Sequence, residues 1–419
     1  MANVRKLIIY LIFCSTLFVG LFFGENSSGG GKIDHIFLFT FIENFSFDLK
    51  EGLNLFVNHS ASLIHSPVFY IITGFFLKIT NNLTLVKFLN IFVSCLLPYI
   101  FYLIIKTKHK IDTNYIFYFS LVIFLSPYFR SSAIWLLGDN LSLLFFSLSI
   151  LFYFKTNDQK KNLINFYLCF LFLALCCYIR YYYFVFAFYI LYNFNKNLEI
   201  KNFLKLIFFG LIISIPGFFY FFYVIKNFNF LGKLNSYGSI NYYSTGLIIL
   251  SILLFYLIPF IYVKKGELIE YYKNKPKNIF MFLTPILFLY LIDKFYFNNL
   301  IDISSRGGGI FVKLSEIINI NTELFVSVIS FVSLLIIDFL FYKKRFENYF
   351  LLIILVFCFP IYTIYQKYLD PLFYIVFFGL INSTYLKKII ISHAMPLYFL
   401  YGYFLIFLLY AIFYYSIGL

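Results

Sequence analysis

Two carboxylates in polar segments beside long apolar stretches are the side chains best suited to chemistry in this sequence. Asp34 follows a glycine run in GGGKIDH, where an amphipathic stretch begins, and Asp139 lies in GDN, where a long apolar stretch begins. A carboxylate at a membrane surface can act as a general base or hold a divalent metal beside a phosphate. The alternative for each acid is a helix N-cap, a position that Asp often occupies.

Two histidines and two arginines accompany these acids as candidates for substrate binding. His35 directly follows Asp34, and His65 precedes a Ser-Pro pair. Arg130 and Arg180 stand in short breaks between apolar stretches, where the planar donor fork of Arg suits a phosphate group. The alternatives are a solvated or interfacial role for His65 and contact with lipid headgroups for the two arginines.

The last third of the chain offers further polar candidates. Arg306 precedes a glycine triplet that frees the backbone to approach a ligand, so Arg306 and Lys313 are candidates for binding a phosphate. Lys367 and Tyr368 lie at the predicted outer end of an apolar stretch, where the alternative is an interfacial anchor. Asp338 falls inside an apolar stretch, and we expect it to snorkel toward the nearby basic residues.

The composition identifies the elements that must position these residues. Apolar residues make up 62% of the 419 positions and charged residues only 12%, whereas a soluble domain has about 25% charged residues. Lipid must therefore be the solvent for much of the chain. The sequence predicts an all-α, polytopic transmembrane helical bundle, because only helices and closed barrels satisfy backbone groups in lipid.

The apolar stretches predict about 13 spans, each near the length that crosses a bilayer. Segments 162–179 and 181–194 form either a tight hairpin or one kinked unit. The stretch 66–80 is short, and we expect it to lie on the membrane surface as an amphipathic juxtamembrane helix in the first outer loop. The predicted spans are 7–24, 84–105, 113–129, 140–154, 162–179, 181–194, 203–225, 245–263, 278–293, 324–342, 348–365, 370–386 and 390–417.

The basic residues orient these spans. With the N-terminus inside, 21 of the 33 Lys and Arg residues but only six of the 18 acids fall in inside segments, as the positive-inside rule requires. The net charge of +15 therefore indicates topology, not a nucleic-acid partner. We expect one transmembrane domain over 1–419, with a cytoplasmic N-terminus and an active site on the outer face. A bacterial inner (plasma) membrane is favoured, and the endoplasmic reticulum is the alternative. The longest outer loops are 25–83, 226–244 and 294–323.

The order of these features resembles the polytopic glycosyltransferases of the GT-C superfamily, the group similar to protein O-mannosyltransferases and lipid A aminoarabinose transferases. In that group an outer loop with an essential acid follows the first span, here GGGKIDH. A His-Pro-Pro-Leu-Tyr-Tyr-like juxtamembrane helix is matched by HSPVFY, and a span with a basic end by LLPYIFYLIIKTKHK. A Ser-Pro turn with a second acid is matched by SPYFRSSAIWLLGDN, and a late Arg-Tyr-Leu-like motif by KYL.

The resemblance covers 1–195, the expected catalytic core, better than the additional spans of 196–419. It implies an inverting enzyme that transfers a sugar to a glycan or lipid acceptor. The sugar donor is a polyprenyl phosphate held among the membrane lipids. Asp34 would deprotonate the acceptor, and Arg130, Arg180, Arg306 or Lys367 would stabilise the departing phosphate. Because the family often shows paired acids where this chain has Asp34-His35, the need for a divalent metal such as Mg²⁺ or Mn²⁺ stays open.

Two other functions remain open. An envelope polysaccharide polymerase or ligase also uses Arg and His on the outer face with a lipid-linked glycan, but it usually has a large outer loop late in the chain. Here loop 294–323 is of modest length. A lipid-linked glycan flippase or transporter would carry paired charges deep within its spans, and Asp338 is a single such acid.

Overall fold

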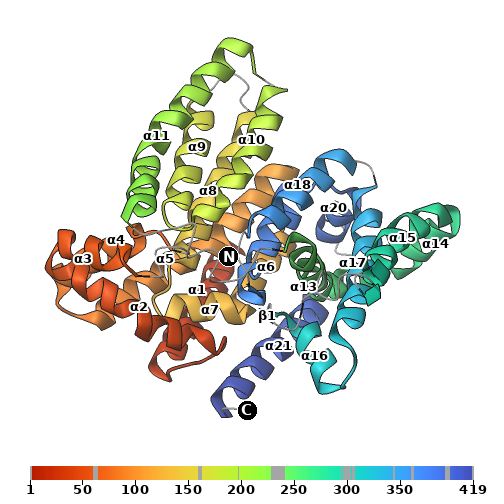
Figure 1. Cartoon of the computed structure of the whole chain (residues 1–419), viewed down its shortest axis with the longest axis horizontal. Helices are drawn as coiled ribbons and strands as arrows, with labels where there is room; N and C mark the ends of the chain where they lie inside the picture. The colour runs from red at the N-terminus through yellow and green to blue at the C-terminus, as the bar shows by residue number, and fades with distance from the viewer. Residues whose placement is uncertain are drawn as a thin grey trace. The chain divides into compact units, whose positions relative to one another are not determined.

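The computed structural model describes residues 2–59, 65–158, 163–196, 198–227, 241–292, 294–295, 303, 307–342, 345–359, 363–391 and 397–417. These residues are helical almost throughout, and the sheet among them is one pair of two-residue parallel strands (Figure 1). The prediction of an all-α fold is therefore confirmed. The chain divides into two compact units, Met1–Tyr237 with Tyr401–Leu419, and Gly238–Leu400.

The first unit contains eleven consecutive α-helices among its described residues, joined by two short 3₁₀-helices, and most of the last helix of the chain. Its elements are α1 (Ala2–Phe22), α2 (Gly30–Phe47), α3 (Leu49–Val57), α4 (Val68–Thr80), α5 (Leu83–His109), α6 (Asn114–Ser120), η2 (Leu121–Leu125), α7 (Pro127–Ile134), α8 (Asp139–Asp158), α9 (Leu163–Cys177), η3 (Tyr181–Val185), α10 (Phe186–Asn195), α11 (Ile200–Asn227) and α21 (Leu397–Ile417).

The second unit combines two long helices, of 21 and 20 residues, with several shorter ones. Its elements are α13 (Tyr242–Tyr262), α14 (Lys265–Asn274), α15 (Pro276–Ile292), β1 (Gly307–Gly308), α16 (Ile310–Ile317), α17 (Thr322–Phe341), α18 (Arg345–Phe357), β2 (Ile364–Tyr365), the 3₁₀-helix η6 (Gln366–Tyr368), α19 (Leu372–Tyr374), the π-helix η7 (Ile375–Leu380) and α20 (Thr384–Ile391). Helix α13 is the core of this unit, since 89% of its most apolar window is buried.

Several helices are long and apolar enough to cross a membrane, which supports a multi-pass membrane protein. In the part of the chain that the structure describes there are six, or up to nine if each of three bent helix pairs counts as one span. The predicted thirteen spans are not confirmed. The six are Val4–Phe22, Leu83–His109, Ile200–Val224, Tyr242–Tyr262, Thr322–Phe341 and Leu397–Ser416.

Breaks in the helices account for the lower number. The predicted span 113–129 ends at Leu125, and α7 continues at an angle of 67° after Ser126, which caps α7 by accepting from the Phe129 N–H. The predicted spans 162–179 and 181–194 give α9 with 15 residues and α10 with 10, both shorter than a crossing needs. Apolar composition alone does not reveal where a helix stops.

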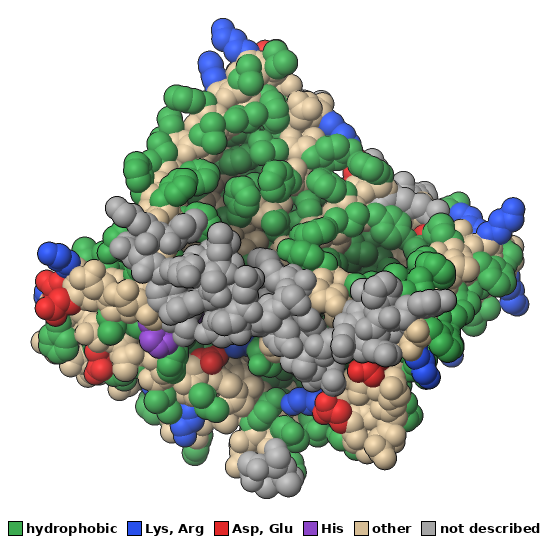
Figure 2. Space-filling model, in the orientation of Figure 1, with side chains coloured by type: hydrophobic (Ala, Val, Ile, Leu, Met, Phe, Trp, Pro, Cys, Tyr) green, Lys and Arg blue, Asp and Glu red, His purple; other side chains and the backbone are tan. Residues whose placement is uncertain are grey.

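Helix α11 presents the most exposed apolar surface among the candidate spans of the first unit. Only 6% of its apolar window is buried, and Phe208, Phe219 and Phe222 are each more than half exposed. Figure 2 shows hydrophobic side chains covering the region of α9 to α11, with basic side chains at the top of the view. Lys201 and Lys205 lie exposed where α11 begins. An apolar helix exposed in this way is stable only in contact with lipid or another apolar surface.

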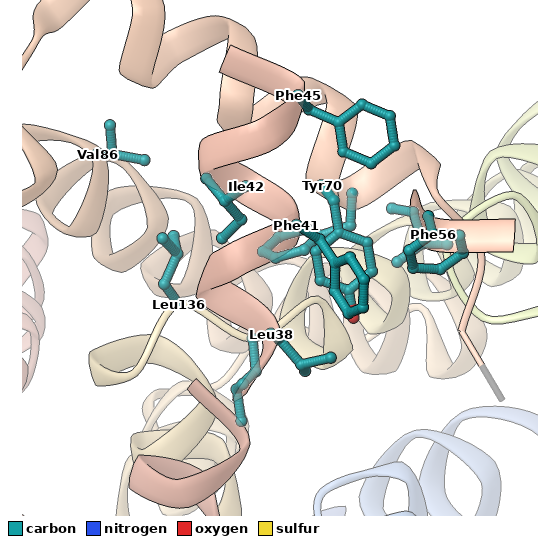
Figure 3. Close-up of a cluster of buried hydrophobic side chains, with 11 residues drawn as sticks. Leu38, Phe41, Ile42, Phe45, Phe56, Tyr70, Val86 and Leu136 are labelled. Carbon is teal, nitrogen blue, oxygen red and sulfur yellow. The ribbon is translucent and has the colours of Figure 1, made fainter. Parts of the chain in front are cut away.

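Helices α2, α3 and α4 of the first loop pack around a shared aromatic cluster. The rings of Phe41, Phe56 and Tyr70 meet at centroid distances of 5.1, 5.3 and 5.9 Å (Figure 3). Gly74 of α4 permits the close approach to α2, because a Cβ there would lie 2.9 Å from the Ile42 carbonyl oxygen. The stretch predicted as a surface helix is thus the 13-residue helix α4, and it holds the loop together.

In the second unit, Asp338 of α17 is fully buried and does not snorkel. Tyr271 and Tyr349 donate to its carboxylate at 3.0 Å each, and Asn278 donates at 2.9 Å. Our expectation of snorkelling is wrong, because hydrogen-bond donors from α14, α15 and α18 replace the water that the carboxylate would otherwise seek.

Candidate active site

The glycine run before Asp34 fixes the start of α2 on α7. Ser28 Oγ donates to Ser131 Oγ at 2.6 Å, and Gly29 has a φ of 68°, in the region that favours glycine. Gly31 touches the same serine so closely that a Cβ would lie 1.9 Å from Ser131 Oγ. The run that the sequence suggests is a flexible turn therefore docks one helix against another and sets the position of Asp34.

Asp34 is the fifth residue of α2 and lies partly buried. The N-cap of this helix is Gly29, so the alternative that Asp34 caps it is wrong. Leu38 and Phe41 follow Asp34 at intervals of four and seven residues, which places all three on one side of α2. That side packs on the aromatic cluster with Tyr70.

Asp139, the second predicted acid, pairs with Arg180. Arg180 Nε donates to Asp139 Oδ1 at 2.8 Å, with Arg180 8% and Asp139 39% exposed. Arg180 NH1 also contacts His65 Nδ1. Since a guanidinium has only donors, Nδ1 is the acceptor, and the proton of the neutral ring is on Nε2. The structure thus brings together three of the predicted site residues from distant parts of the sequence.

Tyr70 connects the two predicted catalytic acids. Burial, followed by the charges of Asp139 and Asp34, raises the pKa of Tyr70 well above its usual range. Its ring also lies 6.3 Å from that of His65, edge to face. The charges of both carboxylates therefore act on the hydroxyl group of Tyr70. Tyr70 stays protonated there and keeps an O–H donor.

A strained turn carries Asp139. Leu136 has a φ of 54°, a left-handed conformation that costs a non-glycine residue about 1–3 kcal/mol and is concentrated at functional sites. Two buried asparagines hold the turn: Asn90 Nδ2 donates to the carbonyls of Ser132 and Ala133, and Asn140 Nδ2 donates to that of Phe129. Sequence reasoning missed both asparagines, although an amide within an apolar stretch was a visible signal.

Arg130, a predicted phosphate ligand, is occupied by a partner that sequence reasoning missed. Its Nε donates to Glu25 Oε1 at 2.8 Å, and NH1 donates to Thr16 Oγ1 at 2.9 Å. The Arg130 and Glu25 side chains are each 8% exposed. The sequence signal for this pair was Glu25, an acid directly after the first apolar stretch. This pair favours a structural role for Arg130, joining α7 to the end of α1, because losing one partner would leave a buried charge.

His35 lies beside the single tryptophan of the chain. Its ring centroid is 6.0 Å from that of Trp135, and its Nδ1 is buried without a hydrogen-bond partner in the described ranges. Lys32 and Lys87 place their ammonium groups 5.8 and 5.2 Å from the Trp135 ring. Burial, and then the charge of Lys87, lowers the pKa of His35 to about 4, so the ring is neutral at pH 7. Sequence reasoning missed Trp135 and both lysines.

The remaining predicted residues belong to the second unit. Lys367 and Tyr368 lie in η6, with the Lys367 ammonium 5.7 Å from the Tyr368 ring. Gln366 anchors this short helix by accepting from the Ile310 N–H and donating to the Tyr256 hydroxyl, each at 3.1 Å. Arg306 lies outside the described residues.

The question of a divalent metal, which the sequence leaves open, finds no ligand cluster in the described part of the chain. No group of three or more His, Cys, Asp or Glu side chains gathers there in a way that could hold a metal ion. Comparison with known proteins gives no family either. No protein-family model, no curated protein and no solved structure matches this chain.

Proposed function

We propose that this protein is an inverting membrane glycosyltransferase. It would move a sugar from a polyprenyl-phosphate donor to a hydroxyl group of a glycan or lipid acceptor on the non-cytoplasmic face. The observation that carries the proposal is the Arg180–Asp139 pair with its His65 contact, beside Tyr70, whose pKa the charges of both Asp139 and Asp34 raise after burial. A GT-C-like arrangement and a cytoplasmic N-terminus are parts of the same proposal, supported by the order of motifs and the positive-inside pattern.

Asp34 acts as the general base in this proposal. It takes the proton of the acceptor hydroxyl, whose oxygen attacks the anomeric carbon of the sugar as the bond to the phosphate oxygen breaks. The electron pair of that bond leaves with the polyprenyl phosphate. Asp139 is held by Arg180 and orients the site, while the neutral Tyr70 donates its O–H to a substrate oxygen.

Lys32 and Lys87 are better placed than the predicted arginines to receive the departing phosphate. Arg130 is engaged by Glu25, and Arg180 by Asp139. Both ammonium groups lie near the Trp135 ring, at 5.8 and 5.2 Å, and the His35 ring lies 6.0 Å from the same ring. Cations fixed near the position of developing negative charge lower the barrier to its departure.

The Arg180–His65 contact favours one second candidate. An envelope polysaccharide polymerase or ligase uses Arg and His on the outer face and a glycan carried on a lipid diphosphate. The two functions differ in the donor, since a glycosyltransferase of the proposed kind takes a single sugar from a lipid monophosphate.

The test is a transfer assay with the purified full chain in lipid vesicles. Labelled polyprenyl-phosphate sugar and a membrane glycolipid extract are supplied, and transfer of label to the extract is followed. We expect transfer from the monophosphate donor and its loss in Asp34→Asn. Transfer only from a labelled lipid-diphosphate glycan would favour the second candidate, and transfer from neither donor would contradict both.

A further inference from the structure

A cleft at the beginning of α1, in the first unit, has the features of a lipid site. None of the residues of the candidate active site lines it. It has a volume of about 570 Å³ and opens between the beginning of α1, the end of α5 and α6. Both α1 and α5 are among the candidate membrane spans. The cleft combines charged side chains with an apolar wall. Its lining residues are Lys6, Leu7, Tyr10, Tyr99, Tyr102, Leu103, Lys106, Asp112 and Phe117.

The polar part of the cleft carries two lysines and one acid. Lys106 Nζ lies 2.6 Å from Asp112 Oδ2, and the Tyr102 hydroxyl donates to Asp112 Oδ1 at 2.6 Å. Lys6 Nζ is 3.9 Å from Asp112 Oδ1, at the limit of an ion pair. Hydrogen bonds from Lys106 and Tyr102 lower the pKa of Asp112, so the acid is ionised. Lys106 neutralises Asp112, so the cluster has one positive charge in excess, which is that of Lys6.

The apolar part continues along α5 from the charged cluster. Three exposed side chains precede Leu103 in α5 at intervals of three or four residues. They are Tyr99, Leu96 and Phe92, which are 45%, 50% and 60% exposed. This spacing puts them on one stripe of the helix. The rise of the helix from Phe92 to Leu103 is about 16 Å, a length comparable to that of an acyl chain. On the α1 side, Leu7 is 57% exposed at the mouth of the cleft.

We propose that this cleft binds one phospholipid with a net negative headgroup, of the phosphatidylglycerol type. Lys6 holds the phosphate beside the Lys106–Asp112 pair, and one acyl chain follows the stripe from Leu103 to Phe92. The excess charge of the cluster matches one phosphodiester, and the apolar stripe gives a lipid an advantage that a free phosphate ion lacks. The site is independent of the proposed glycosyl transfer, since neither acid of the candidate active site takes part.

The test uses the full chain purified in detergent with lipid added back. Native mass spectrometry and the midpoint of thermal unfolding are measured with dioleoyl phosphatidylglycerol, phosphatidylethanolamine, phosphatidylcholine or inorganic phosphate. We expect one phosphatidylglycerol to bind about tenfold more tightly than either other lipid, a difference of about 1.4 kcal/mol in binding free energy. Equal binding of the three lipids, or equal stabilisation by inorganic phosphate, would overturn the proposal.

Two variants locate the site, with a matched control. The pair Lys6→Gln and Lys106→Gln should abolish the preference for phosphatidylglycerol, whereas Lys201→Gln with Lys205→Gln should keep it. The control lysines are exposed at the start of α11, another apolar helix. Leu103→Trp fills the cleft without changing a charge and should also weaken binding, which keeps the test decisive if the double lysine variant fails to fold. Equal loss in the control pair would show general attraction to lipid and refute the site.

Discussion

Arg180 donates from Nε to Oδ1 of Asp139 at 2.8 Å, although 41 residues separate the two in the sequence. The same guanidinium contacts His65, so one nearly buried cation joins the beginning of α8, the end of α9 and the segment before α4. Such a group positions an acid while leaving it partly exposed to substrate. The geometry of the candidate site depends on this one side chain.

Replacing Arg180 by Lys keeps the charge but removes the planar fork that serves two partners. We expect sugar transfer to fall about tenfold or more, because the acid and the histidine lose their common anchor. In a double-mutant cycle with Asp139→Asn, the coupling free energy of unfolding should be about 1 kcal/mol, because Asp139 is 39% exposed and water screens the pair. Arg5→Lys, at an exposed position of α1, is the control. Strictly additive effects of R180K and D139N would refute the positioning role.

Gly31 offers a steric test of how Asp34 is positioned. A Cβ at Gly31 would overlap Ser131 Oγ, so Gly31→Ala should shift the start of α2 and destabilise the fold by about 1–3 kcal/mol. Gly30→Ala is the matched control, because nothing lies within 4 Å of a Cβ there. Thermal unfolding and sugar transfer are the measurements. If both variants behave alike, the docking of the glycine run does not position Asp34.

The pKa of His35 predicts a dependence of stability on pH. The native ring, with a pKa of about 4, resists protonation that the unfolded chain accepts near 6.5, so stability is complete above pH 6.5 and is lost as the pH falls toward 4. Between pH 7 and pH 5 the loss should be about 2 kcal/mol. Unfolding of His35→Phe at the two pH values should lack this component, and His59→Gln should retain it. An unchanged slope in H35F would assign the pH dependence elsewhere.

Trp135 reports directly on the proposed phosphate site, since it is the single tryptophan of the chain. Polyprenyl phosphate bound between Lys32 and Lys87 would change the charge around the indole ring, so we expect a saturable change in its fluorescence. The double variant Lys32→Gln and Lys87→Gln should reduce the affinity at least about tenfold, while Lys78→Gln on α4 should not. Full affinity in the double variant would remove both lysines from the site.

The sequence predicted the class of fold but not where its helices end. Hydropathy detects the long runs that become α1, α5 and α11, whereas the 67° break after Leu125 depends on local capping at Ser126. Hydropathy therefore counts broken and short helices as spans. The number of predicted spans exceeded the structural candidates for this reason.

The candidate site was predictable where a polar residue stands out from its neighbours, as Asp34 and Asp139 do. Pairings across the fold were not predictable, because Glu25 and Arg130 are 105 residues apart and either could have faced water or lipid. Asp338 shows the same limit: its burial depends on donors from three other helices, which no local pattern reveals.

The most direct measurement is transfer of labelled sugar from a polyprenyl-phosphate donor by the reconstituted protein, compared between Asp34→Asn and Asp48→Asn. Asp48 lies in the same loop and caps α3, a role that Asn fills equally well. We predict that D34N inserts and unfolds like the wild type but loses transfer by at least about a hundredfold, as expected for a general base, while D48N remains active. Full transfer by D34N would contradict the central claim.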